Sequence, residues 1–209
     1  MKLTFSAGLF ALLAGASLIG VSAQAAGSAA EVIASAVADP ARPQNSAPTP
    51  AVHDGQHDFD FNIGVWTTHI ERTVDPFAAK SDTLELSGTV TVRKVWDGKA
   101  ELEEIEADGP KGHWEGLTLF LYNPTAHQWS QSFVNSKVGA ISGSSNVGEL
   151  KDGRIVLTGQ DTVNDRTILI RAIWSDIKTD SHQYEELYSN DGGMTWVRSF
   201  IAHLTRLNH

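Results

Sequence analysis

The sequence of 209 residues contains no cysteine. This absence excludes disulfide bonds, thiolate nucleophiles and cysteine-ligated zinc. It also excludes a lipid anchor at the end of a signal peptide, because that modification needs a cysteine at the cleavage site. The fold must therefore be stabilised by the burial of apolar side chains alone.

Basic residues are scarce. Lys and Arg number 16 against 25 Asp and Glu, a formal net charge of −9, and loss of Lys2 with a signal peptide would make it −10. Phosphate groups repel a chain this acidic. We therefore expect neither a nucleic acid nor an anionic membrane surface as a partner.

The motifs of several enzyme classes are missing. The sequence has no Gly-x-Ser-x-Gly nucleophile elbow, no phosphate-binding glycine loop before a helix and no propeller-like internal repeat. Four glutamates on one expected strand could provide the carboxylate pair of a glycoside hydrolase. They occur at both odd and even positions, however, and successive side chains of a strand point to opposite faces, so at least two of them face solvent. We interpret them as an acidic strand edge and identify no catalytic residue. These residues are Glu101, Glu103, Glu104 and Glu106.

An export signal is present at the N-terminus. Lys2 provides a positive charge, the stretch from Leu3 to Val21 is uncharged and apolar, and a small-x-small cleavage site ends at Ala25. We expect residues 1–25 to be a signal peptide rather than a membrane anchor, because glycine and serine dilute the apolar stretch. The mature protein is then periplasmic or secreted and is not inserted in a membrane.

The residues after the signal divide into two parts. Residues 26–52 are rich in alanine and proline, a composition typical of a disordered linker. Residues 53–209 form the folded domain. About 155 residues can bury roughly two thirds of the surface of the unfolded chain, so a domain of this length needs no disulfide.

Alternating apolar segments separated by turn residues predict an all-β domain. Such sequential strands form an antiparallel up-and-down sheet, and about ten of them close into a barrel that removes the exposed edges. A short helical turn near Phe59 to Ile63 is expected to plug one end. The strands are expected at residues 65–73, 83–96, 99–107, 113–122, 127–134, 138–148, 153–162, 166–175, 181–189 and 195–207.

Two local motifs support a barrel. In the first, the aromatic segment from Phe59 leads into Gly64-Val65-Trp66, where the tryptophan would close the barrel floor under Arg198 or Arg206. The second is an Asp-box, Ser-x-Asp-x-Gly-x-Thr-Trp, which forms a structural hairpin turn in other proteins. Its defining residues are Ser189, Asp191, Gly193, Thr195 and Trp196.

Together these motifs, with Tyr122-Asn123-Pro124 and Arg171-Ala172-Ile173-Trp174, resemble a family of uncharacterised bacterial calycin-like (lipocalin-like) β-barrels. The resemblance spans residues 57 to 207 and implies the fold, but the family has no settled activity to carry over. A shorter similarity to nitrobindin-type barrels, which hold haem through a histidine on a late strand, implies His203 as a haem ligand. We favour an outward-facing or hydrogen-bonded histidine over a haem ligand at this position, and His203 is the residue to test.

The remaining polar residues suggest few sites. His53 and His57 have the spacing of a helical metal pair, but Gly55 and the adjacent linker argue against a helix, so we predict a solvated segment and no metal site. Charged residues on the last three expected strands would form a salt-bridged floor or contact a ligand if they pointed inward. If they point outward, they form ion pairs on the surface. The residues expected to line a ligand site are Trp66, Phe120, Arg171, Glu186, Arg198 and His203.

Three functions are compatible with such a barrel. The first is binding of a small, largely apolar molecule in the interior, which requires a cavity of a few hundred Å³. The second is a structural or partner-binding barrel without a pocket. The third is a hydrolase or isomerase, which requires a histidine within hydrogen-bond reach of a carboxylate inside the cavity.

Overall fold

The structure is a computed structural model that describes residues 53–207 apart from residues 142 and 164–165. The expected signal peptide (1–25) and linker (26–52) lie outside the described residues, so both stay predictions. Within the described part of the chain, no helix is both long enough and apolar enough to span a bilayer.

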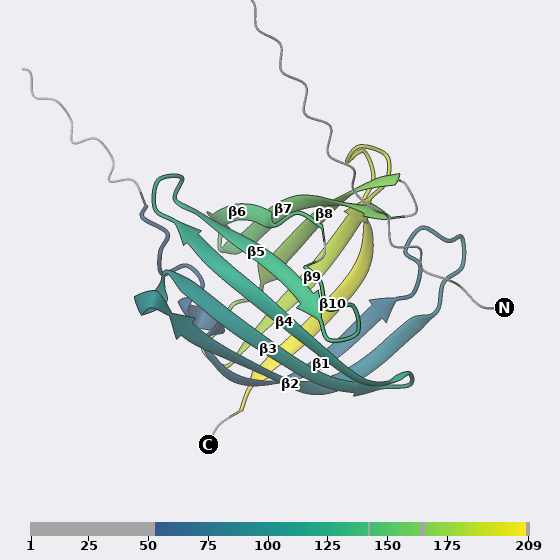
Figure 1. Cartoon of the computed structure of the whole chain (residues 1–209), viewed down its shortest axis with the longest axis horizontal. Helices are drawn as coiled ribbons and strands as arrows, with labels where there is room; N and C mark the ends of the chain where they lie inside the picture. Colours follow the sequence, from purple (N-terminus) through teal and green to yellow (C-terminus); the bar gives the residue numbers. More distant parts are fainter. Residues whose placement is uncertain (1–52, 142, 164–165, 208–209) are drawn as a thin grey trace, which may run out of the picture. The chain divides into compact units, whose positions relative to one another are not determined.

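Ten antiparallel strands form one closed barrel (Figure 1), which confirms the predicted fold class. Each strand pairs with the next in sequence, and β1 pairs with β10 to close the barrel. A 3₁₀ turn, η1 (Asp60–Asn62), precedes β1, as predicted, and η2 (Trp96–Gly98) connects β2 to β3. The strands are β1 (Gly64–Thr73), β2 (Thr83–Val95), β3 (Ala100–Gly109), β4 (Gly112–Asn123), β5 (Gln128–Asn135), β6 (Asn146–Lys151), β7 (Arg154–Val163), β8 (Arg166–Ser175), β9 (Ser181–Ser189) and β10 (Val197–Arg206).

The predicted strand limits agree with these to within about two residues, except for β6. The expected strand 138–148 is wrong over its first part, because β6 begins only at Asn146. Val138 and Ile141 suggested a strand, but their side chains are exposed. Gly139 and Gly143 have positive φ angles of 65° and 60°, which interrupt an extended backbone.

The closed end of the barrel, defined here as the end that carries η1, is built around Trp66. This side chain is fully buried, and its indole Nε1 donates to the Asn62 carbonyl at 2.7 Å. The guanidinium of Arg206 lies 4.0 Å from the centre of its ring, so Arg206 supplies the cation–π contact and the exposed Arg198 does not. Gly64 has φ 134°, and a Cβ there would lie 2.4 Å from Arg206 Nη1. The Gly-x-Trp motif therefore leaves room for the arginine.

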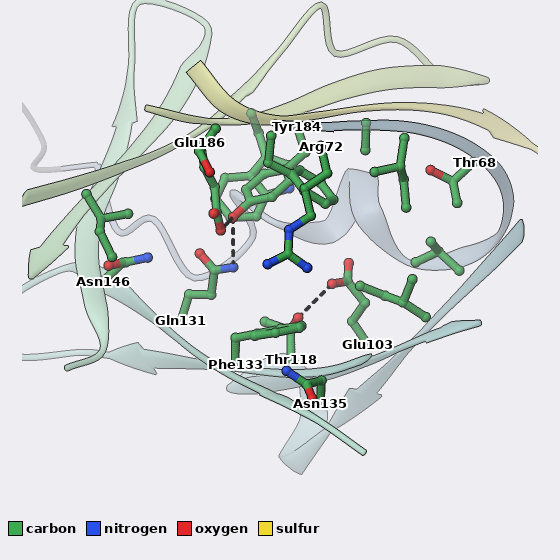
Figure 2. Close-up of a pocket in the computed structure, with 18 of the residues that line it drawn as sticks. Thr68, Arg72, Glu103, Thr118, Gln131, Phe133, Asn135, Asn146, Tyr184 and Glu186 are labelled. Carbon is green, nitrogen blue, oxygen red and sulfur yellow. Dashed lines mark hydrogen bonds between the residues drawn. The ribbon is translucent and has the colours of Figure 1, made fainter. Parts of the chain in front are cut away.

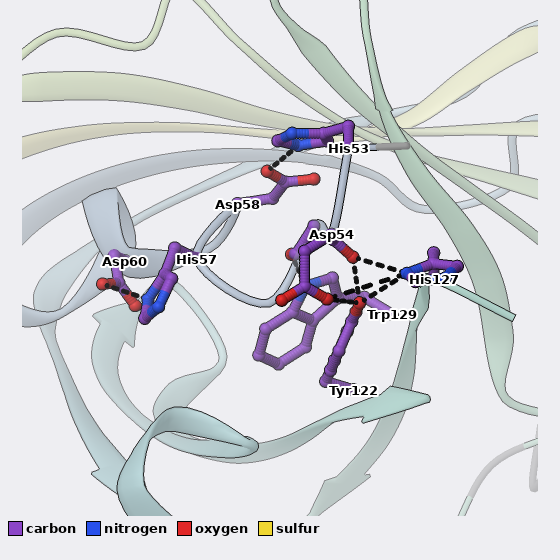
Figure 3. Close-up of polar contacts among 9 residues, drawn as sticks. His53, Asp54, His57, Asp58, Asp60, Tyr122, His127 and Trp129 are labelled. Atoms are coloured by element: carbon purple, nitrogen blue, oxygen red, sulfur yellow. Dashed lines mark hydrogen bonds and ion pairs between the residues drawn. The ribbon is translucent and has the colours of Figure 1, made fainter. Parts of the chain in front are cut away.

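The segment before β1 plugs the closed end (Figure 3). Phe59 is fully buried, with its ring centre 5.1 Å from that of Trp129, and burial of such a side chain contributes roughly 1.5–3 kcal/mol. Trp129 Nε1 donates to the Gly55 carbonyl at 2.8 Å, and the Tyr122 hydroxyl donates to Asp54 Oδ1 at 2.6 Å. These contacts fix the chain that enters the barrel.

Apolar side chains fill the barrel near the closed end. One core cluster surrounds Phe59 and Phe120, and a second surrounds Trp66 and Ile70. Inward residues alternate along each strand, as in Thr68, Ile70 and Arg72 of β1, all of which line the interior. The interior beyond this packing is not filled, and it forms the candidate site.

Candidate ligand-binding site

A cavity of about 260 Å³ lies inside the barrel (Figure 2). It runs from the packed closed end toward the loop end, defined as the end with the β1–β2, β5–β6 and β9–β10 connections. Much of its wall is apolar and aromatic. Representative wall residues are Ile70, Val90, Ile105, Trp114, Phe133 and Trp174.

The floor of the cavity is polar. Glu103 is 8% exposed; its Oε1 accepts a 2.8 Å hydrogen bond from Thr118 Oγ1, and its Oε2 accepts one of 3.4 Å from Asn62 Nδ2. Burial raises the pKa of this carboxyl group, and the two donors lower it by less. Glu103 therefore favours the neutral form more than an exposed glutamate does.

Glu101 lies next to Glu103 on the inner face of β3. It is fully buried, and neither carboxylate oxygen has a hydrogen-bond partner among the described residues. Burial, then Asp60, raises its pKa to about 8, although Lys94 opposes the shift. The interpretation of these glutamates as an acidic edge is therefore wrong for Glu101 and Glu103. Alternation places only Glu104 and Glu106 on the exposed outer face.

A second polar group lies on β9. Tyr184 donates to Glu186 Oε1 at 2.5 Å, and Tyr188 donates to Glu186 Oε2 at 3.0 Å. Gln131 Nε2 from β5 donates to the Tyr184 hydroxyl at 3.3 Å. Burial and the neighbouring Glu186 raise the pKa of both phenols, so they act as donors. The Glu186 carboxylate is thus held by two neutral hydroxyl groups.

Arg72 brings a positive charge to the same cavity. Figure 2 shows its guanidinium pointing into the space between Gln131 and Glu103. Arg72 pairs in register with Phe200, which pairs in turn with Glu186, so the three residues form one row across β1, β10 and β9. A β-bulge between Arg198 and Phe200 brings both Ser199 and Phe200 to the cavity wall.

His182 lies deep in the cavity wall. It is 3% exposed, and its ring meets Trp66 edge to face with 4.5 Å between the ring centres. Burial, followed by the charge of Arg206, lowers its pKa to about 4, so the imidazole is neutral at pH 7. Within the described residues neither ring nitrogen has a hydrogen-bond partner, and no carboxylate lies within 4.0 Å. The contact that the enzyme hypothesis requires is not formed there.

Of the six residues expected to line a ligand site, the structure places only Glu186 in the cavity wall. Trp66 and Phe120 point inward but belong to the filled cores. Arg171 lies outside, with its guanidinium 3.8 Å from the centre of the Trp196 ring.

Arg198 and His203 are on the outer face of β10 and are exposed. His203 lies opposite His69 on that outer face. His203 therefore faces outward, the interpretation favoured from the sequence. The haem option is wrong for the barrel interior, because β10 presents Ala202 and Leu204 to the cavity.

The Asp-box residues form a hydrogen-bonded turn between β9 and β10. Asp191 Oδ2 accepts from Thr195 Oγ1 at 2.6 Å, and Asp191 Oδ1 accepts from Ser189 Oγ at 2.7 Å. The Gly193 amide donates to Ser189 Oγ at 2.9 Å, and Trp196 Nε1 donates to the Gly193 carbonyl at 3.0 Å. The bonds from Thr195, then Ser189, lower the pKa of Asp191 to about 2.

The N-terminal histidines pair with single carboxylates (Figure 3). His53 Nε2 lies 2.7 Å from Asp58 Oδ1, and His57 Nδ1 lies 3.1 Å from Asp60 Oδ2. Over the described ranges no group of three or more His, Asp or Glu side chains is arranged to hold a metal ion.

Several cavity residues were not expected from the sequence, above all Arg72, Glu103 and Gln131. The signal for Arg72 was present, because counting every second residue from the inward Trp66 reaches position 72. The signal for Glu103 was ambiguous, since acidic residues occur on both faces of β3. Gln131 gives no sequence signal of its own, because its role depends on Tyr184 from a distant strand.

Fold and cavity together define a closed calycin-like barrel with an interior site of mixed polarity. No family model matches the chain, and no curated protein matches it significantly. The structure is similar to the S-type phycobiliprotein lyase CPES from Guillardia theta, with a TM-score of 0.51, 9% identity, and coverage of 76% of this chain and 95% of the lyase. A de novo designed fluorescence-activating β-barrel matches with a TM-score of 0.36, 13% identity, and coverage of 71% and 95%.

Proposed function

We propose that this protein is an exported barrel that binds a small, largely apolar molecule in its interior. The observation that carries this proposal is the cavity of about 260 Å³, with aromatic and aliphatic walls and a few polar groups. At about 30 Å³ for each water molecule, the space corresponds to about nine waters, or a ligand of on the order of ten non-hydrogen atoms.

Buried polar atoms in the cavity support this proposal. Thr68 Oγ1, Gln131 Oε1 and Asn146 Oδ1 are buried and have no hydrogen-bond partner within the described part of the chain. Polar atoms in such positions are nearly always paired, with protein, water or a ligand. A ligand with a few polar groups on an apolar body would complement them. The lyase shares only its fold with this chain, so no ligand is carried over from it.

Ligand binding in the interior is testable with indole, a neutral aromatic molecule of suitable size. We expect saturable binding at one site by isothermal titration calorimetry, with a raised melting temperature. Ala202→Leu and Ala202→Phe fill the cavity progressively and should weaken binding in that order, because Ala202 lines it. His203→Phe changes the outer face of the same strand and should bind like the unmodified protein, while circular dichroism confirms folding.

Absence of binding by indole, by phenylacetate and by phenethylamine would contradict the proposal. Equal affinities in the Ala202 variants and the unmodified protein would place the binding elsewhere.

Export rests on the sequence alone, through the charged, apolar and small-x-small parts of residues 1–25. The expected mature protein begins at Ala26. Edman sequencing of the protein recovered from periplasmic and cytoplasmic fractions tests this, and a cytoplasmic protein that retains the first 25 residues would contradict export.

A further inference from the structure

We propose that the ligand of this cavity is a small organic acid whose anionic group is bound by Arg72. This inference rests on the proposed interior binding and specifies the chemical class of the ligand: a carboxylate on an aromatic or short aliphatic body of about ten non-hydrogen atoms.

The guanidinium of Arg72 is not used by the protein. In the described ranges it donates no hydrogen bond and has no carboxylate within 4.0 Å. The Arg72 side chain is exposed to solvent, and its guanidinium points into the cavity. Arg206 differs: it donates to the carbonyls of Thr179, Ile63 and Phe61 at 2.8 to 3.2 Å and covers Trp66. Arg206 is therefore structural, whereas the five N–H donors of Arg72 are accessible to solvent and available to a ligand that displaces water.

The carboxylates that line the cavity already accept hydrogen bonds within the protein. Both oxygens of Glu186 accept hydrogen bonds from tyrosines. Both oxygens of Glu103 accept hydrogen bonds, one from Thr118 and one from Asn62. Asp161 Oδ1 accepts from the Thr162 amide at 2.7 Å. The cavity wall therefore has a cation, Arg72, without a partner among the described residues, whereas each of its carboxylates accepts at least one hydrogen bond from the protein. This asymmetry favours an anionic ligand over an ammonium ligand.

The position of the anion follows from the same row of residues. Glu186 repels an anion on its side of Phe200, so the ligand carboxylate is expected on the side of Arg72 that faces Glu103 and Thr68. Burial favours the neutral form of Glu103, which limits repulsion from the floor. Thr68 Oγ1, which lacks a partner among the described residues, is available there as a further hydrogen-bond donor.

The aromatic walls of the cavity indicate the shape of the apolar part of the ligand. Trp114 and Phe133 are stacked with ring centres 6.0 Å apart, and Trp174 and Tyr184 lie 4.5 Å apart. Aromatic walls suit a flat ring. An aromatic acid of the size of phenylacetate satisfies both the walls and Arg72.

The test compares three probes with the same ring and different charge: phenylacetate, 2-phenylacetamide and phenethylamine. By calorimetry at pH 7, phenylacetate should bind at least about tenfold more tightly than 2-phenylacetamide, as expected for a charge-assisted bond to arginine. Arg72→Gln should abolish this difference, and Arg72→Lys should retain part of it. Arg198→Gln is the matched control, because Arg198 is exposed like Arg72 but lies on the outer face of the barrel.

Each result decides between the two proposals. Preference for phenylacetate that is lost in Arg72→Gln and kept in Arg198→Gln supports the inference. Equal or tighter binding of 2-phenylacetamide or phenethylamine overturns it while interior binding stands. A preference that survives in folded Arg72→Gln also overturns it. If none of these probes binds but indole does, this inference alone fails; if indole does not bind either, the proposed function itself fails.

Discussion

At the scale of single residues, two buried groups on the closed side of the cavity give the fold opposite pH dependences. Glu101 has a pKa raised to about 8, and His182 has a pKa lowered to about 4. The unfolded chain releases the glutamate proton near pH 4.5 and the histidine proton near pH 6.5. Stability therefore falls as pH rises from 4.5 to 8 because of Glu101, and it falls as pH drops from 6.5 to 4 because of His182.

The Glu101 effect can be measured above pH 6.5, where the His182 effect is absent. Each pKa unit corresponds to about 1.4 kcal/mol, so Glu101 lowers the free energy of unfolding by up to about 5 kcal/mol between pH 4.5 and 8, of which about 2 kcal/mol falls above pH 6.5. We expect Glu101→Gln to reduce the decline in stability between pH 6.5 and 8.5 by about this amount. Urea unfolding at a series of pH values, followed by tryptophan fluorescence, checks this.

Glu104→Gln is the control, since it removes a carboxyl group from the outer face of the same strand. It should leave the decline unchanged. A decline from Glu103 is expected to remain in Glu101→Gln, because burial raises the Glu103 pKa as well. If Glu101→Gln and the unmodified protein decline in parallel, then Glu101 is ionised in the fold.

At the scale of elements, the turn between β9 and β10 depends on one carboxylate. Asp191 accepts bonds from Ser189, the Thr195 amide and the Thr195 hydroxyl. Asp191→Ala removes all of them, and the midpoint of urea unfolding should fall with an unchanged m-value. The difference should shrink as pH falls from 3.8 toward 2, because protonated Asp191 accepts fewer bonds.

The neighbouring Asn190 provides the comparison for that turn. It is exposed, so Asn190→Ala should have little effect. Equal destabilisation by the two substitutions would show that the carboxylate has no special part in the turn.

The limits of the strands could be predicted from the sequence better than the direction of the polar side chains that they carry. Apolar alternation and turn pairs such as Asp152-Gly153, which has φ angles of 52° and 73°, fix where β7 begins. The start of β6 was not predictable. Val138 and Ile141 are apolar residues of the kind found in strands, but they lie exposed in the connection that precedes β6. The inward direction of Glu101 and Glu103 required the barrel itself, since local pattern gave neither face of β3 an apolar preference.

At the scale of the whole molecule, closure of the barrel could be inferred from ten sequential strands, but the site could not. Arg72, Glu103 and Gln131 meet in one cavity although they belong to β1, β3 and β5. Which inward positions are filled and which line open space depends on side-chain volumes from all ten strands. The plug formed by Phe59 decides that the closed end is filled, and the cavity is what remains.

The pairing of β1 with β10 has a consequence for the order of assembly. Trp66 and Arg206 are register partners, whereas every other neighbouring strand pair in the described barrel is consecutive in the chain. Joining such distant segments is the entropically costly step of folding. A nascent chain that has not yet released β10 therefore has two free strand edges and no enclosed interior. The capacity to enclose a ligand arises only once β10 has been synthesised and has paired with β1.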